Sequence, residues 1–585
     1  MPDSPILDWT DDGHPRSRVF GDIYFSPEDG LGESRAVFLE GCELPGAWAG
    51  RDRFVVGELG FGAGLNILAL LELWRRERPA DGRLHIFSIE AYPVTAEDML
   101  RAVARWPEIA DLAQALAQRW PGKARGLHRV EFPELAAILD LAVAPVEDAL
   151  AAWDGAADAW FLDGFSPALN PQMWSPQVMA QVAARSAPGA KVATFTVAGA
   201  VRRGLQAAGF EVEKRPGFGR KRERLAAWLP GEAPARARPT VAVVGAGIAG
   251  ASAVRALEAL GLEPVLFEGE APGAGASGNP AGLVTPRLDA GLGPVAELGA
   301  RTLARARTLY DALPGAVIAS GVLQQAGEAK DTDRFAKIAA SDLFEPGEMV
   351  ATAEGLEMSG ARVISPRAVL AAWAPQVRTE KVGGLARDGE AWRLLDNEGF
   401  EIWRGDAVIL ANGPDLARLW PQVTLTPTRG QASWTLDPAQ VRPSAWGGYA
   451  IPTGAGLLFG ATHDRDDTAT EVRDEDHRRN LATLAQGRPE LAAGIDAGGL
   501  KGRASVRAAT QDRLPLAGAL APGLYALGGF GSRGLAMAPL LAEHVAARIA
   551  HSPSPLPHHL SALVEPERFR IRAARRGRIS DATPA

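Results

Sequence analysis

Short apolar runs alternate with longer stretches rich in Ala, Leu and Arg through both halves of the chain. The runs RFVVGEL, RLHIFSIE and DAWFLDGF have the length and composition of buried strands, and helical stretches separate them. This alternation is typical of parallel α/β sheets. The segment GEAPARARP at 231–239 breaks the pattern with Pro, Ala and Gly, so we interpret it as a linker. The pattern therefore predicts two α/β domains, at 1–230 and 240–555, and a basic tail at 556–585.

Composition narrows the class of protein. The chain has 585 residues, of which 46% are hydrophobic and 23% charged, as in soluble globular proteins of two or three domains. No apolar run approaches the ~20 residues that cross a bilayer, and the acidic start MPDSPILDWTDDG lacks the apolar core of a secretory signal. Cys42 is the single cysteine, which excludes an internal disulfide framework and a cysteine metal cluster. We therefore expect a cytoplasmic protein without a metal site.

The first glycine-rich run, ELGFGAGLN, follows a predicted strand and opens a predicted helix. Glycines at alternate positions let the backbone bend tightly and approach a ligand. The next strand, 85–90, ends in an acid that is placed to bind the two hydroxyls of a ribose. The run lacks the Lys-Ser/Thr of a phosphate-binding loop and resembles the S-adenosylmethionine (SAM) methyltransferase fold, with a ligand-free tight turn as the alternative. The candidate SAM contacts are Glu58, Gly60, Gly62, Gly64, Asn66 and Glu90.

A third run of the first domain, DAWFLDGFSP, suggests a catalytic acid. Asp163 follows the strand in this run, and ligands of open α/β sheets bind at the carboxyl ends of strands. The segment DGFSP stands where amine methyltransferases carry an Asp/Asn-Pro-Pro-aromatic loop. A carboxylate there accepts a hydrogen bond from an amine and helps to remove its proton. The alternative role of Asp163 is to cap the following turn.

The second glycine-rich run, GAGIAG at 245–250, is a complete dinucleotide fingerprint between a strand and a helix. A pyrophosphate would lie over the helix N-terminus, and Glu268 would take the ribose hydroxyls. The small residues of GASGN let the backbone wrap a second stretch of cofactor, which favours FAD over NAD. A glycine-rich turn within 525–539 can place N–H groups against a ring carbonyl. The candidate FAD contacts are Gly245, Gly247, Gly250, Glu268, Ala276, Ser277, Gly278, Asn279, Gly529, Gly531, Ser532, Gly534 and Leu535.

These segments, in this order, resemble the FAD-dependent D-amino-acid oxidase and glycine oxidase group, in which a mixed-sheet substrate domain is inserted into the FAD-binding Rossmann domain. Members of that group oxidise an amine that bears a carboxylate, and arginine can clamp a carboxylate with two hydrogen bonds. Arg507 and Arg533 stand in the matching places, each with a surface or structural role as the alternative. No general base is evident, and none is needed if a neutral amine passes hydride to the flavin.

The two halves together resemble one family, the bifunctional tRNA 5-methylaminomethyl-2-thiouridine biosynthesis proteins. Matching runs include GELGFGAGLN, DAWFLDGFSPALNPQMW, GFGRKRE, GASGNPAGLVTPRL and GSRGLAMAPL. The resemblance implies that the FAD domain removes the carboxymethyl group from a carboxymethylaminomethyl wobble uridine, and that the Rossmann-like methyltransferase domain then methylates the exposed amine with SAM. Members of the family tend to end the strand before DAWFLDGF with an acid. Here Ala144-Pro145 stand there, with Glu147 and Asp148 beyond.

The basic residues set the expectation for RNA. The net charge of −8 argues against a protein that coats nucleic acid, but a local basic patch remains compatible with one folded RNA. Such a patch lies between 202 and 224, and six arginines lie between 568 and 578. Clusters of this kind contact phosphates, although a solvated charged face is the alternative. The candidate RNA contacts are Arg202, Arg203, Arg220, Lys221 and Arg222.

Two other functions remain open from the sequence. One is an oxidase of free amino acids fused to an unrelated small-molecule methyltransferase, and the other is a flavin-binding RNA module without turnover. The GFGRKRE patch favours RNA over a free amino acid, and Arg507 with Arg533 favours turnover over binding alone. The sequence leaves the oligomeric state open, a monomer included, and does not identify the tRNAs or the acid that contacts the SAM adenine.

Overall fold

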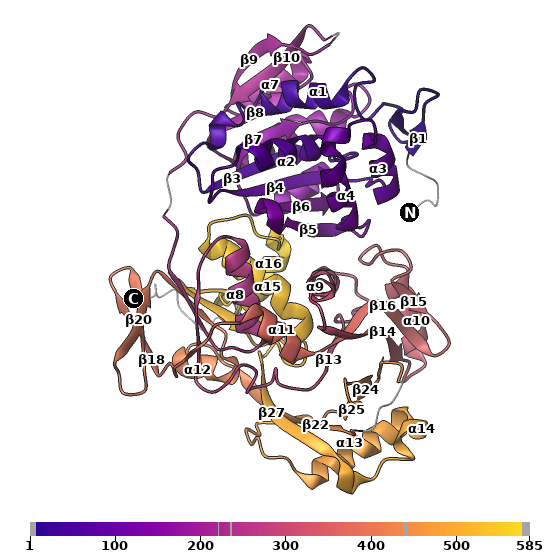
Figure 1. Cartoon of the computed structure of the whole chain (residues 1–585), viewed down its shortest axis with the longest axis vertical. Coiled ribbons are helices and arrows are strands. Elements are labelled where there is room, and N and C mark those ends of the chain that lie inside the picture. Colours follow the sequence, from indigo (N-terminus) through magenta and orange to yellow (C-terminus); the bar gives the residue numbers. More distant parts are fainter. Residues whose placement is uncertain (1–6, 220, 235–236, 437–440, 576–585) are drawn as a thin grey trace. The chain divides into compact units, whose positions relative to one another are not determined.

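The computed structural model describes residues 7–219, 221–234, 237–436 and 441–575. The chain divides into two compact units (Figure 1). The first comprises Met1–Ala237 and Ser552–Pro557, and the second comprises Arg238–His551 and His558–Ala585. Within the described residues no helix combines the length and apolarity that crossing a bilayer requires.

The first unit is built on an eight-stranded sheet in the order β5-β6-β4-β3-β7-β8-β10-β9. The five central strands from β6 to β8 are parallel. At one edge β5 pairs antiparallel with β6, and at the other edge β10 pairs antiparallel with both β8 and β9. Helices α2 and α4 contribute to the hydrophobic core on one face, and α5, α6 and α7 to the core on the other. Both faces are therefore covered, and this explains why the central strands are almost continuously apolar.

The strands of the first unit are β1 (Leu7–Trp9), β2 (Pro15–Ser17), β3 (Arg53–Leu59), β4 (Arg83–Glu90), β5 (Gly126–Phe132), β6 (Ala137–Val143), β7 (Ala157–Leu162), β8 (Ser186–Thr194), β9 (Glu211–Pro216) and β10 (Glu223–Trp228). Its helices are α1 (Gly30–Ser34), α2 (Leu65–Glu77), α3 (Ala96–Val103), α4 (Ala110–Gln118), α5 (Val146–Ala152), α6 (Pro176–Ala184) and α7 (Gly199–Ala207).

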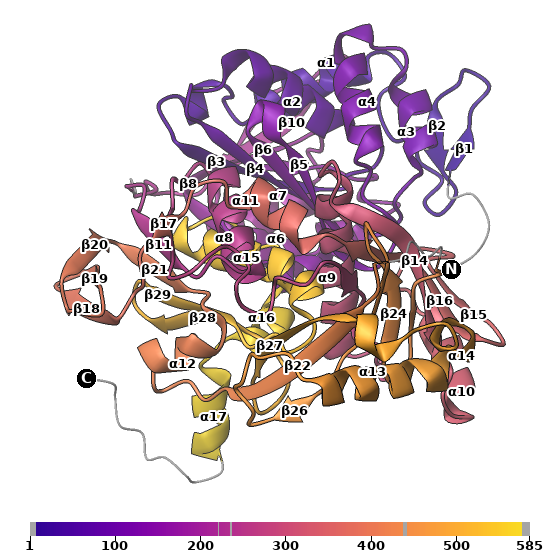
Figure 2. The same cartoon turned by 60° about the horizontal axis from the view of Figure 1, so that its bottom comes forward.

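The second unit contains a Rossmann-type sheet and a larger mixed sheet. The first has the order β17-β12-β11-β21-β29-β28 and is parallel except for β28. Helix α15 packs against α8 and α9. The second sheet has ten strands, including the long pair β22 and β27, and α13 contacts β22 (Figure 2). A small antiparallel sheet is formed by β18, β19 and β20.

The strands of the second unit are β11 (Val241–Val244), β12 (Val265–Glu268), β13 (Gly282–Val284), β14 (Val317–Gln325), β15 (Met349–Ala351), β16 (Gly355–Ile364), β17 (Arg378–Thr379), β18 (Gly384–Asp388), β19 (Ala391–Leu395), β20 (Glu401–Gly405), β21 (Ala407–Leu410), β22 (Thr426–Trp434), β23 (Ser444–Ala445), β24 (Tyr449–Pro452), β25 (Leu457–Gly460), β26 (Asp464–Arg465), β27 (Lys501–Ala509), β28 (Leu516–Ala521) and β29 (Leu524–Gly528). Its helices are α8 (Ile248–Ala259), α9 (Pro294–Asp311), α10 (Lys330–Ala339), α11 (Pro366–Trp373), α12 (Leu416–Leu419), α13 (Asp474–Gly487), α14 (Pro489–Ala492), α15 (Gly534–Ile549), α16 (His558–Val564) and α17 (Arg568–Arg575).

Two candidate active sites

The glycine loop of the first unit joins β3 to α2. Gly60, Gly62 and Gly64 have φ angles of 85°, 54° and 73°, a region that residues with a side chain rarely adopt. A Cβ on Gly60 would lie 3.1 Å from Cα of Gly164, in the turn that follows β7. The glycines therefore allow the loop to pack directly against the turn that carries Asp163.

The acids predicted from the sequence lie around this loop. Glu90 ends β4, and its Oε2 accepts a hydrogen bond of 2.9 Å from the backbone N–H of Gly62. Asp163 follows β7, and its Oδ2 accepts a hydrogen bond of 2.7 Å from the side-chain amide of Asn66. Its Oδ1 accepts from the backbone N–H of Gly164 at 2.8 Å. Asn66 and Asp163 are thus in direct contact although they are far apart in sequence.

Burial makes two of these carboxyl groups weak acids. Burial, with the nearby Asp163 carboxylate as a further cause, raises the pKa of Glu58 to about 8. Burial likewise raises the pKa of Asp163 to about 6, against the hydrogen bonds from Gly164 and Asn66. Ser88 donates a hydrogen bond to Oε2 of Glu58, whereas Oε1 of Glu58 has no hydrogen-bond partner among the described residues. A buried acceptor without a partner is costly, so the site fits a ligand that brings a hydrogen-bond donor, as SAM does.

Phe165 of the DGFSP segment lies in a cluster with three aromatic side chains that were not predicted from the sequence. The ring of Phe165 lies 4.9 Å from that of Phe20 and 5.2 Å from that of Tyr24, between centroids. Phe20 in turn lies 5.8 Å from Tyr92. Phe20 and Tyr24 come from the irregular segment after β2, which has no hydrophobic periodicity to mark it. The aromatic residues around DGFSP thus come from distant parts of the sequence.

The acid that contacts the SAM adenine is not evident at the end of β6. That strand ends at Val143, and the exposed residues Glu147 and Asp148 lie in the first turn of α5. Asp140, in the middle of β6, is buried and accepts hydrogen bonds from Arg129 at 2.8 Å and from Nε2 of His85 at 2.7 Å. Burial would raise the pKa of Asp140, but Arg129 and His85 hold it well below its usual range. Asp140 is therefore committed to a structural ion pair.

The glycine loop of the second unit joins β11 to α8 in a close-packed turn. Gly245 has a φ of 103°, and a Cβ there would lie 2.7 Å from Cα of Asn412. A Cβ on Gly250 would lie 1.8 Å from the carbonyl oxygen of Gly245, so the helix can approach the strand only with glycine there. Glu268 accepts a hydrogen bond of 2.8 Å from the backbone N–H of Ala246. This geometry is that of a dinucleotide-binding loop.

A cavity of about 1140 Å³ opens over this loop. The predicted residues that line it are Gly245, Gly247, Glu268, Ala276, Ser277, Asn279, Arg507, Gly529, Gly531, Ser532, Arg533, Gly534 and Leu535. Gly250 and Gly278 are not among the lining residues. Asn412 also lines the cavity, and in the described part of the chain its buried Oδ1 has no hydrogen-bond partner. The size, the glycine-lined wall and this unpartnered acceptor fit a dinucleotide such as FAD.

Arg503 of β27 is a structural part of this site that sequence reasoning missed. Its Nη2 lies within hydrogen-bond distance of the carbonyl oxygens of Gly273, Ala274 and Gly275, at 3.2, 2.5 and 2.6 Å. These carbonyls belong to the turn that precedes the predicted cofactor segment 276–279. Arg503 therefore fixes the start of that segment from a strand more than 200 residues away in the chain.

The two predicted clamp arginines both line the cavity. Arg507 donates a hydrogen bond of 3.0 Å to the carbonyl oxygen of Thr462, and Arg533 donates one of 2.8 Å to that of Pro286. In the part of the chain that the structure describes, neither forms an ion pair with a carboxylate. Burial lowers the pKa of both guanidinium groups. Two cations without acidic partners in one cavity favour an anionic ligand.

Comparison with curated proteins identifies the family. The chain is 58% identical to the tRNA 5-methylaminomethyl-2-thiouridine biosynthesis bifunctional protein MnmC of Caulobacter sp. (strain K31), over 98% of both chains. The chain belongs to this family. The MnmC protein of Caulobacter vibrioides is also 58% identical, over 97% of this chain and 98% of that one, and the MnmC protein of Maricaulis maris is 43% identical.

Two domain families match successive parts of this MnmC-family chain. Residues 107–230 match the S-adenosyl-L-methionine-dependent methyltransferases, and residues 240–548 match the FAD dependent oxidoreductases. The first match lies within the first unit and the second within the second unit. Among solved structures, glycine oxidase from Geobacillus kaustophilus is 20% identical with a TM-score of 0.45, and covers 55% of this chain and 97% of its own.

The predicted RNA contacts of this MnmC-family chain lie in two places. Arg202 and Arg203 are exposed on α7, and Arg222 is exposed before β10, whereas Arg220 lies outside the described residues. Lys221 forms an ion pair of 2.8 Å with Glu33, and its charge opposes the rise that burial causes in the pKa of Asp163. Lys221 is therefore near the candidate methyltransferase site.

Proposed function

We propose that the protein carries out two successive reactions on the wobble uridine of tRNA. The second unit removes the carboxymethyl group from a 5-carboxymethylaminomethyl side chain, and the first unit methylates the amine that is left. The observation that carries this proposal is the pair Arg507 and Arg533. Both are half-buried cations on the wall of a dinucleotide-sized cavity, and neither has an ion-pair partner among the described residues. The carboxylate that they would hold is the group that the first reaction removes.

In the oxidation, the chain's own contribution is to hold and orient the substrate. Arg507 and Arg533 would bind the carboxylate of the glycine-like arm and thereby place its methylene in the cavity. Bound FAD would accept a hydride from that methylene, with the amine nitrogen supplying the electron pair of the new C=N bond. Water then adds to the imine, and hydrolysis gives the primary aminomethyl group and glyoxylate. The glycines 245 and 247, Glu268 and the 529–535 turn would hold the cofactor.

In the methylation, Asp163 would accept a hydrogen bond from the primary amine and keep the nitrogen lone pair directed at the methyl group of SAM. Asn66 holds the Asp163 carboxylate in place through a hydrogen bond of 2.7 Å. Glu58, Glu90 and the loop glycines would bind SAM. The reaction forms a C–N bond, breaks the C–S bond of SAM and releases one proton from the amine, which Asp163 receives first.

We further propose that the partner is tRNA and that the protein works in the cytoplasm. The exposed cations Arg202, Arg203 and Arg222 supply phosphate contacts, and the anticodon loop is unpaired, so its base can enter a pocket. In the described part of the chain no cluster of His, Cys, Asp and Glu could hold a metal ion, and the mechanism uses none.

Nucleoside analysis of hypomodified tRNA after reaction with the purified yellow protein tests both steps. Without SAM, the primary aminomethyl nucleoside should accumulate, and with SAM it should become the methylaminomethyl product. Asp163→Ala should stop at the primary amine even with SAM, because the amine acceptor is gone. Arg507→Ala should leave the carboxymethylated starting nucleoside.

The same experiment separates the rival function. An amino-acid oxidase fused to an unrelated methyltransferase would reduce its flavin with free glycine and leave hypomodified tRNA unchanged. That result would overturn the proposal.

A further inference from the structure

A row of cations extends from the proposed clamp across the mixed sheet. In the strand pairing, Thr428 of β22 is opposite Arg507 of β27 on one side and opposite Arg465 of β26 on the other. Directly opposite residues of antiparallel strands point to the same face of a sheet. Arg465 and Arg507 therefore point to the same face of the sheet, which is the face on which β22 carries the cavity residues Gly430 and Ala432. The backbones of Arg465 and Arg507 are about 10 Å apart, because two strand spacings separate them.

Three guanidinium groups act on one imidazole at the end of this row. Burial lowers the pKa of His463 most. The positive charges of Arg507, Arg465 and Arg513 lower it further, and the charge of Asp464 opposes them. We call His463, Arg465 and Arg513 the rim cluster; all three side chains are exposed. Among the described residues the structure shows no ion pair for Arg465 or Arg513. Like charges gathered in this way repel one another, and an anion bound among them would relieve that repulsion.

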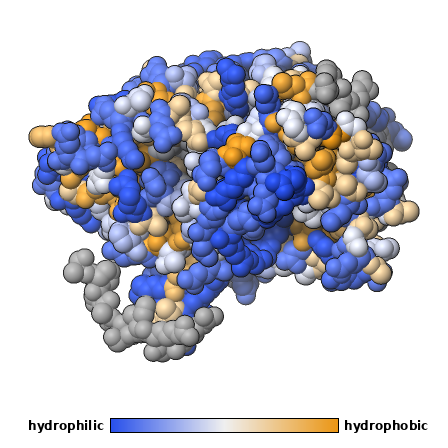
Figure 3. Space-filling model, turned by 90° about the horizontal axis from the view of Figure 1, so that it is seen from below, coloured by the Kyte–Doolittle hydropathy of each residue, from blue (hydrophilic) through white to orange (hydrophobic). Residues whose placement is uncertain are grey.

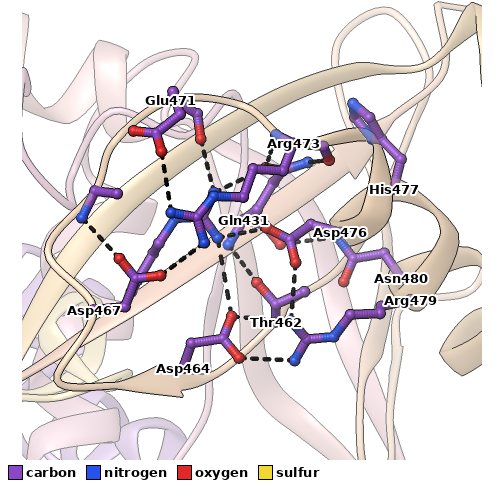
Figure 4. A network of polar contacts seen from close by, with 12 residues as sticks. Gln431, Thr462, Asp464, Asp467, Glu471, Arg473, Asp476, His477, Arg479 and Asn480 are labelled. Carbon is purple, nitrogen blue, oxygen red and sulfur yellow. Dashed lines mark hydrogen bonds and ion pairs between the residues drawn. The ribbon is translucent and has the colours of Figure 1, made fainter.

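The carboxylates next to the rim cluster are engaged elsewhere (Figure 4). Asp464 alternates to the opposite face of the sheet, where Arg479 binds both of its oxygens at 2.9 and 3.0 Å. Asp467 accepts from Arg473 at 2.7 Å. Asp512, the neighbour of Arg513, is paired with Arg568 and Arg572. Of the neighbouring acids in the described chain, the exposed Asp466 is left without an ion pair. Its single negative charge does not offset the two positive charges of Arg465 and Arg513, so the cluster keeps a net positive charge.

We propose that the rim cluster binds the phosphate backbone of the tRNA beside the nucleotide whose side chain enters the flavin cavity. This inference rests on the proposed function. The surface that Figure 3 shows is mostly hydrophilic, which is compatible with a polar partner such as RNA. Arg507 and Arg533 already supply a clamp for the substrate carboxylate. The rim cluster is exposed, and its Arg465 lies two strand spacings from Arg507, where the rest of the nucleotide would extend. Contacts of this kind add affinity and position the RNA without reading its sequence.

Salt-dependent binding of an anticodon stem-loop to the full-length, flavin-loaded protein tests the proposal. Each phosphate contact that is lost should lower the slope of log affinity against log salt by about 0.7 to 0.9. Arg465→Gln and Arg513→Gln should each show this decrease in slope. The double variant should bind the stem-loop about tenfold more weakly at 0.15 M ionic strength. Glutamine keeps much of the side-chain length and removes the charge. Arg478→Gln is the matched control, because Arg478 is also exposed but lies on α13.

A second measurement separates phosphate from carboxylate binding. The substrates are hypomodified tRNA and the free carboxymethylaminomethyl nucleoside, which has no phosphate. In the double variant the ratio of kcat/KM for tRNA to kcat/KM for the nucleoside should fall about tenfold. An unchanged salt slope in the double variant, or an equal loss with both substrates, would overturn the proposal. If the unaltered protein neither binds the stem-loop nor transfers electrons from tRNA to its flavin, the proposed function itself is wrong.

Discussion

The Asp163 carboxyl combines burial with a proposed role that requires its charge. Burial raises its pKa to about 6, and the hydrogen bonds from Gly164 and Asn66 limit the rise. A protonated carboxyl cannot receive the proton of the amine, so the useful form is lost as the pH falls through about 6. The residue therefore works close to the edge of its own titration range, where one hydrogen bond decides how much of it is ionised.

We expect the rate of methyl transfer to fall as the pH decreases, with an inflection at about pH 6. Asn66→Ala removes a hydrogen bond that favours the ionised form, so this inflection should move to higher pH. Single-turnover methylation of aminomethylated tRNA, with SAM saturating, measures both profiles. The amine of the substrate also loses its proton as the pH rises. This titration is the same with both proteins, so it does not cause a difference between the two inflections. If the two profiles have the same inflection, Asp163 is not the titrating group.

At the scale of elements, strand β22 serves two structures at once. Its residues Gly430 and Ala432 line the flavin cavity, and Thr428 points to the same face. Arg429 and Gln431 point to the opposite face, where Gln431 belongs to the polar network of Figure 4. Arg429 is fully buried there and forms an ion pair of 2.5 Å with Asp476. Gln431 donates its backbone N–H to the hydroxyl of Thr462, the residue whose carbonyl accepts from Arg507. The network thus holds the loop against which the clamp arginine rests.

Gly430→Ala tests how closely the strand holds Arg507. A Cβ at this position would lie 1.7 Å from Nη2 of Arg507 and 2.9 Å from the carbonyl oxygen of Thr462, so the guanidinium must move. We expect kcat/KM for oxidation of tRNA to fall at least about tenfold, the effect of losing one charged hydrogen bond. Methyl transfer to aminomethylated tRNA serves as the internal control.

Gly454→Ala is the matched variant, since no atom of the described residues lies within 4 Å of its added Cβ. It should oxidise tRNA as the unaltered protein does, with the same flavin content. Oxidation by Gly430→Ala at the rate of Gly454→Ala would mean that the position of Arg507 does not depend on this glycine.

The elements that could be predicted from the sequence are those with local patterns. RFVVGEL and VAVV coincide with β3 and β11, because each is a short apolar run next to a glycine turn. The family of the chain was predicted correctly as well. Phe20, Arg503 and the pairing of Arg465 with Arg507 through Thr428 could not be predicted in this way. They depend on which distant strands become neighbours, and a single sequence contains no periodicity that reports this.

At the scale of the whole molecule, two compact units carry separate sites with their own cores. In the proposed function the product of one unit is the substrate of the other. The chemistry requires only that the aminomethylated tRNA reaches the first unit after it leaves the second. A tRNA that dissociates between the steps is sufficient for this.

A mixture of two damaged proteins tests this independence. We expect Asp163→Ala and Arg507→Ala, mixed in equal amounts with SAM, to convert hypomodified tRNA to the methylaminomethyl product, since each variant supplies the step that the other lacks. Each protein alone should stop at a different nucleoside, which mass analysis distinguishes. A mixture that accumulates only the primary amine would show that both steps must occur on one chain.

The two-sided use of β22 also limits how this chain can change in length. Side chains of a strand alternate with a period of two, so deleting one residue before Gly430 would turn Arg429 toward the cavity and the glycine toward α13. Both the buried ion pair and the space for the clamp would then be lost together. A shortened turn elsewhere in the same sheet, such as the one around Gly454, carries no such double penalty. Evolution and design should therefore find insertions and deletions tolerated in the turns of this sheet and rejected within this one strand.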